Sequence, residues 1–110
     1  MADISAGISA LVNELNTLRN NSGDPKLQAK LQTILTQILF PLWQEIIQQK
    51  IANTTPEYLA AAASLDAATK SAQAAEADIA KVAQAIADAV KAAKAVDQVV
   101  GVVLPLLGLL

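Results

Sequence analysis

The chain has 110 residues, of which 54% are hydrophobic, and a formal net charge of -2 at pH 7. This length is typical of one domain, and the 8 basic residues are too scattered among 10 acidic ones to form a nucleic-acid-binding surface. The lack of Cys excludes disulfides, and the lack of His removes the commonest metal ligand and general base. We therefore expect a single domain, 1–110, with no cofactor, no metal site and no nucleic-acid partner.

A first helix is expected over about residues 4–20. Its apolar residues recur at alternating spacings of four and three, which places them on one helix face: Ile4, Ile8, Leu11, Leu15 and Leu18. The segment 20–23, Asn-Asn-Ser-Gly, ends the pattern, because Asn and Gly accept the left-handed backbone that closes helices. Gly7 costs about 1 kcal/mol relative to Ala inside a helix, so it indicates either a late start or a close backbone contact.

A second helix is expected over residues 25–52. Asp24 supplies a side-chain cap, and Pro25 lacks an N–H at a position where the helix needs none. The apolar face is too wide for one neighbour, which favours a central helix packed on two sides. Pro41 removes one backbone hydrogen bond, yet the apolar pattern resumes at Ile46, so we predict a kink at Pro41 and not a break.

A third helix is expected over residues 56–100. The segment from Tyr58 to Val100 contains no Gly or Pro, and Ala is the best helix former, so we predict one continuous Ala-rich rod. Apolar residues recur along it at alternating spacings of three and four, and we call this stripe the heptad seam. Its members are Leu65, Ala68, Ala72, Ala75, Ile79, Val82, Ile86, Ala89, Ala93, Val96, Val100, Val103, Leu107 and Leu110.

The three expected helices differ greatly in length. At about 1.5 Å per residue the third would exceed roughly 60 Å, whereas the second would reach about 40 Å and the first about 25 Å. We therefore predict an all-α fold, either an up-down-up three-helix bundle or an extended helical hairpin, with a protruding third helix. The protruding seam favours a homo-oligomer or a helical protein partner. The residues expected at that interface are Leu65, Ile79, Val82, Ile86, Val96, Val100 and Val103.

The last twelve residues, 99–110, form an uncharged apolar tail. A membrane-spanning helix needs roughly 20 residues, so a conventional anchor is disfavoured. The tail is interpreted either as a core or interface segment bent over the bundle, or as a segment that inserts into a bilayer. A second uncharged stretch, 31–44, is an acceptable amphipathic surface. Under the lipid interpretation the contacting residues are Val102, Leu104, Leu106, Leu107, Leu109, Leu110, Phe40 and Trp43.

Enzyme signatures are missing from the sequence. The acidic residues of the third helix avoid the seam and so lie on a solvated face, where carboxylates do not acquire the pKa values of general acids and bases. Glu14 and Glu45 lie near apolar stripes, but a di-metal bundle needs more acids and usually His. We therefore expect a non-enzymatic structural or interaction protein that self-associates through the heptad seam and has no small-molecule substrate. The alternative is a membrane-active protein, a pore-forming component or a peripheral coat.

The amino-terminal residues, Met-Ala-Asp-Ile-Ser, lack the positive region and the continuous apolar core of a secretory signal. We expect a cytoplasmic location, with membrane association and export by a signal-independent route as alternatives. Without a secretory signal, the Asn-x-Ser/Thr triplets at Asn20 and Asn53 are interpreted as helix-boundary residues and not as glycosylation sites.

Overall fold

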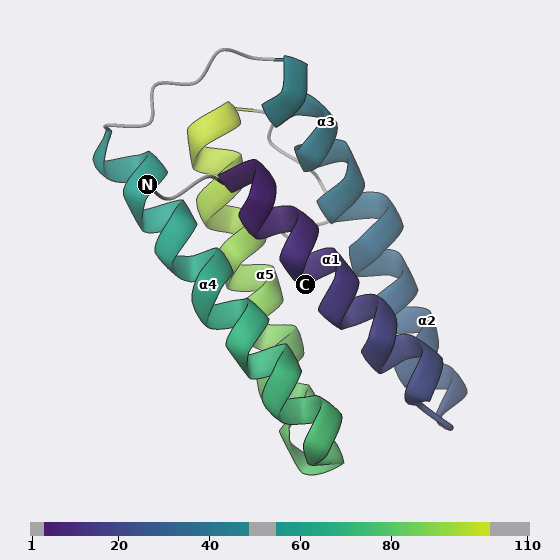
Figure 1. Ribbon diagram of the computed structural model, residues 1–110. Helices are drawn as coiled ribbons and strands as arrows, with labels where there is room; N and C mark the ends of the chain where they lie inside the picture. The colour runs from purple at the N-terminus through teal and green to yellow at the C-terminus, as the bar shows by residue number, and fades with distance from the viewer. Residues whose placement is uncertain (1–3, 49–54, 102–110) are drawn as a thin grey trace.

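A computed structural model describes residues 4–48 and 55–101, and every regular element among them is a helix. In chain order these are α1 (Ile4–Asn21), α2 (Pro25–Thr33), the π-helical segment η1 (Ile34–Leu39), α3 (Phe40–Gln48), α4 (Pro56–Ala77), the 3-10 helix η2 (Ile79–Lys81) and α5 (Val82–Val100). Because α2, η1 and α3 follow one another without a gap, the described residues form four rods (Figure 1). The expected all-α class is therefore confirmed for this part of the chain.

The first rod, α1, packs mainly along α4. Its regularly spaced large apolar residues are all buried: Ile4, Ile8, Leu11, Val12, Leu15 and Leu18. A Cβ atom added at Gly7 would lie 3.1 Å from Cδ1 and 3.2 Å from Cβ of Leu65, so the backbone of α1 approaches α4 closely at Gly7. The N–H of Ile4 donates to the hydroxyl of Tyr58 at 3.1 Å, which fastens the start of α1 to the same helix.

The second rod passes through Pro41 without ending. In an α-helix, Pro41 would leave the carbonyl of Gln37 without its donor and would clash with it. The N–H of Phe40 instead donates to the carbonyl of Leu35, five residues back, and this wider turn gives the Pro ring room. At the other end the carboxylate of Asp24 accepts the N–H of Lys26 at 3.0 Å, as a helix cap does. The expected end of this helix, residues 49–52, lies outside the described residues.

The predicted continuous third helix, 56–100, was wrong, because the chain turns back at Asp78. Asp78 has an extended backbone (φ -144°, ψ 102°), and its N–H closes α4 by donating to the carbonyl of Ala74 at 3.1 Å. Its carboxylate then accepts the N–H of Ala80 at 3.1 Å and so starts the next helix. Helix α5 runs antiparallel along α4, which is the most extensive helix contact in the structure (Figure 1).

This reversal turns the heptad seam inward. Ten of the seam residues, all those described except Ile79, are buried: Leu65, Ala68, Ala72, Ala75, Val82, Ile86, Ala89, Ala93, Val96 and Val100. The many Ala side chains let α4 and α5 approach closely, and α1 and the second rod complete the core. Two short antiparallel helices therefore bury within one chain the stripe that a single rod would have exposed.

Candidate interaction surfaces

The residues expected at an oligomer interface mostly lie in the core of the single chain. Leu65 and Val96 have no exposed surface, and Val82, Ile86 and Val100 are also buried. Ile79, in contrast, is 68% exposed at the turn between α4 and α5. Val103 lies outside the described residues. The structure does not bring the six described residues together on one surface, and the buried ones hold the fold together.

Phe40 and Trp43, two of the residues expected at lipid, lie together on the surface of α3. Their ring centroids are 6.5 Å apart and the ring planes differ by 28°. Phe40 is 38% exposed and Trp43 is half-buried. The other six residues expected at lipid lie outside the described part of the chain: Val102, Leu104, Leu106, Leu107, Leu109 and Leu110.

Ile47 extends this surface by one further turn and is 66% exposed. Phe40, Trp43 and Ile47 follow the spacing i, i+3, i+7, which places them on one side of a helix, and we call them the α3 apolar face. With Gln44 they line a hollow of about 360 Å³. Ile47 was predicted only as part of a wide packing face, because the sequence alone does not show which side of a wide apolar face stays uncovered.

Trp43 is held in position by α1 and by the anchoring of its own helix in the core. Its indole N–H donates to the hydroxyl of Ser5 in α1 at 3.2 Å, which satisfies the polar edge of the ring. Leu42, its neighbour in sequence, is fully buried and anchors this turn of α3 in the core. The ring is therefore fixed in position, with its apolar remainder next to Phe40.

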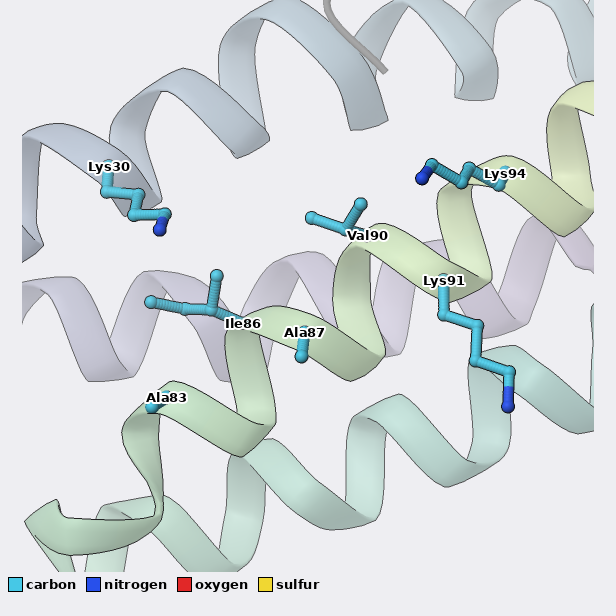
Figure 2. A pocket seen from close by; sticks show the side chains of 7 residues that line it. All are labelled: Lys30, Ala83, Ile86, Ala87, Val90, Lys91 and Lys94. Carbon is cyan, nitrogen blue, oxygen red and sulfur yellow. The ribbon is translucent and has the colours of Figure 1, made fainter. Parts of the chain in front are cut away.

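A second surface is a groove between α2 and α5, with a volume of about 460 Å³ (Figure 2). We call it the lysine groove, and its lining residues are Lys30, Ala83, Ile86, Ala87, Val90, Lys91 and Lys94. Figure 2 shows Lys30 and Lys94 extending towards the groove from opposite ends, with Ile86 and Val90 between them, whereas Lys91 points away. Sequence reasoning missed this groove because Lys30 is far in sequence from the residues of α5.

Acidic side chains gather where α1 meets α4. The side-chain amide of Gln73 donates to Glu14 at 3.4 Å. A side-chain hydrogen bond with Glu14, helped by slight burial and by the charge of Glu14, raises the pKa of Glu76 above its ordinary value of 4.5. Glu14 thus lies beside α4. Among the described residues, no three Asp or Glu side chains are grouped closely enough to hold a metal ion.

A polar contact between α4 and α5 involves Ser71. Its hydroxyl donates to the carboxylate of Asp88 at 2.5 Å, and the side-chain amide of Gln84 donates to the other oxygen at 2.9 Å. The donors come from both helices, so the contact fixes their relative position near the turn.

Among the residues that the structure describes, the α3 apolar face and the lysine groove are thus two surfaces whose composition suits binding. None of the helices in the described ranges, 4–48 and 55–101, is long and apolar enough to cross a membrane. No known protein family, curated protein or solved structure matches the chain. The function is therefore inferred from these surfaces alone.

Proposed function

We propose that this chain is a non-enzymatic helical protein that associates with lipid surfaces through the α3 apolar face and the apolar segment 102–110. The observation that carries the proposal is the row of Phe40, Trp43 and Ile47 on one side of α3, in which Phe40 and Ile47 are exposed and Trp43 is half-buried. Aromatic and aliphatic side chains of this kind are favoured at the boundary between lipid headgroups and acyl chains, where their apolar surface leaves water.

The position of the face supports the same function. In Figure 1, α3 and the C-terminal end of α5 lie at the same end of the bundle. Residues 102–110, which are uncharged and apolar, follow directly after that end of α5. Helix α3 therefore lies near the last described residues of α5, and the sequence continues from there into the apolar segment.

The size of the face favours lipid over a stable protein partner. An aromatic side chain buries about 150–250 Å² when fully covered, and Phe40 and Trp43 are already partly covered, so the face provides on the order of a few hundred Å². A stable protein interface buries roughly 800 Å² on each partner. Lipid insertion has no such threshold, because each side chain that leaves water contributes independently at about 25 cal/mol per Å².

The test is binding to vesicles of phosphatidylcholine, with and without phosphatidylglycerol. Trp43 is the single Trp of the chain, so a blue shift of the emission reports directly on the α3 apolar face. We expect the emission to shift and the protein to float with vesicles. An unchanged spectrum, together with protein that stays in the aqueous fraction with both lipids, would refute the proposal.

A matched pair of variants locates the contact. Ile47→Ser removes an apolar side chain that is 66% exposed on α3, and Ile79→Ser removes one that is 68% exposed at the far turn. Burying an Ile side chain is worth about 1.5–3 kcal/mol, so Ile47→Ser should weaken vesicle binding by roughly tenfold or more. Ile79→Ser should leave it unchanged, and equal losses in both variants would contradict a specific role for α3.

A second candidate function is self-association through the same face. The hollow of about 360 Å³ beside Phe40 and Ile47 favours it, because a hollow accepts a protruding side chain of a second copy better than a flat surface does. Light scattering with size-exclusion chromatography separates the candidates. An oligomer without lipid that becomes monomeric in Ile47→Ser supports self-association, and a monomer without lipid rejects it.

A further inference from the structure

The lysine groove combines two features that recognise an anionic amphiphile. Its floor consists of Ala and the nearly covered side chains of Ile86 and Val90, which are 7% and 8% exposed. Its rim carries three of the 8 basic residues of a chain whose net charge is negative. Basic side chains thus lie at both ends of an apolar strip, although the chain as a whole has no excess of them.

The three Lys side chains are available to a ligand. Among the described residues, the ion pair found is Lys70 with Asp66, and no carboxylate pairs with Lys30, Lys91 or Lys94. Like charges that share a groove repel one another, so an anion placed between them is attracted by each. The groove therefore offers charge complementarity that the protein itself leaves unused.

The dimensions select a small linear ligand. Ile86, Val90 and Lys94 are four residues apart along α5, so the strip extends over roughly 12 Å at about 1.5 Å per residue. The volume of about 460 Å³ lies in the range of small-molecule sites, roughly 300–1,000 Å³. A helix is about 10 Å across, so a volume of this size suits a single extended chain better than an acidic partner helix.

We propose that the lysine groove binds a single-chain anionic amphiphile, a fatty-acid-like molecule whose carboxylate lies at one end of the groove and whose alkyl chain lies along Ile86 and Val90. Lys30 and Lys94, one at each end, are the two residues that can bind the carboxylate, because both point towards the groove (Figure 2). Lys91 points away and contributes only to the general positive potential. This site is distinct from the α3 apolar face, and the proposal does not depend on lipid binding there.

The probe is sodium decanoate below its micelle concentration, titrated into the full chain by calorimetry. Acetate serves as the head without the chain, and decyl maltoside as the chain with an uncharged head. We expect heat of binding with decanoate alone, and amide NMR shifts confined to the groove, at Ala83, Ile86, Ala87 and Val90. Equal binding of decyl maltoside would overturn the role of charge, and equal binding of acetate would overturn the role of the chain.

Variants test the assignment of the residues. The double variant Lys30→Ala, Lys94→Ala removes the carboxylate contact at either end and should weaken decanoate binding by roughly threefold to tenfold, as expected for a partly solvated charge-assisted contact. Lys26→Ala, an exposed Lys one turn earlier on α2, is the matched control and should have no such effect. Ala87→Glu places a carboxylate at an exposed position of the lining and should abolish binding while the circular dichroism spectrum stays unchanged. A loss in Lys26→Ala equal to that in the double variant, or retained binding in Ala87→Glu, would overturn the proposal.

Discussion

At the scale of single residues, small side chains set how closely the helices approach. Gly7 lies against Leu65, and one of the two nearest atoms there is the Cβ, which cannot rotate away without moving the backbone of α4. The usual penalty of about 1 kcal/mol for Gly in a helix is therefore offset by a close contact between α1 and α4. This position should tolerate no branched side chain.

Gly7→Val should lower the free energy of unfolding by about 1–3 kcal/mol, because the added carbons overpack the contact with Leu65. Ala6→Val is the matched control, since Ala6 is exposed and the same side chain there costs only a few tenths of a kcal/mol through helix propensity. Urea denaturation measures both. Equal stability of the two variants would show that α1 can move away from α4 without cost.

Glu76 gives the fold a dependence on pH. Its pKa is raised in the folded state by the hydrogen bond with Glu14, by slight burial and by the charge of Glu14. The folded protein therefore holds the proton more tightly than the unfolded chain, and stability falls as pH rises above about 4.5, the ordinary value. The repulsion is absent at lower pH and fully present once Glu76 is ionised.

Glu76→Gln should therefore stabilise the protein at pH 7 by a few tenths of a kcal/mol, the size expected for an exposed like-charge pair. The gain should vanish as the pH is lowered below about 4.5. Thermal melts across this range measure the difference. In a Glu14→Gln background the same substitution should have no effect at any pH, and a persistent gain there would mean that the two carboxylates do not interact.

At the scale of elements, local signals predicted the helix starts but not the reversal at Asp78. Asp24 before Pro25, and Thr55 before Pro56, combine a capping side chain with a Pro, and both helices begin there. Asp78 also caps a helix, yet it stands without Gly or Pro inside an Ala-rich segment where propensity favours continuation. Packing of α5 along α4 decides the outcome, and a local pattern does not contain that information.

Asp78→Ala should lower the free energy of unfolding by about 1 kcal/mol through loss of the cap on Ala80. It also removes the main obstacle to a continuous helix, so α5 should leave its own α4 and pack on that of a second copy, giving a domain-swapped dimer at high concentration. Light scattering detects the dimer. Asp24→Ala loses a comparable cap on α2 and should stay monomeric, and a dimer in both variants would point to general destabilisation.

At the scale of the whole molecule, the sequence predicted which side chains are apolar and periodic, but not what covers them. The heptad seam is real as a pattern, yet its partner is the other half of the same segment. The α3 apolar face was named in part, through Phe40 and Trp43, because aromatic residues stand out in a chain with only 3% of them. The lysine groove was not predicted, because it forms only when α5 is folded back beside α2.

Val96→Asp distinguishes a seam buried within one chain from a seam shared between copies. Val96 has no exposed surface, so a carboxylate there would be buried without a partner, and we expect a loss of several kcal/mol and an unfolded chain. An intermolecular seam would instead yield a folded monomer. Ile79→Asp is the control, because Ile79 belongs to the seam but is 68% exposed, and its variant should keep the helical circular dichroism and mass of the unmodified protein. If Val96→Asp remained folded while an oligomer dissociated, the seam would have to be an interface between chains, and α5 would pack in solution against a different copy of α4.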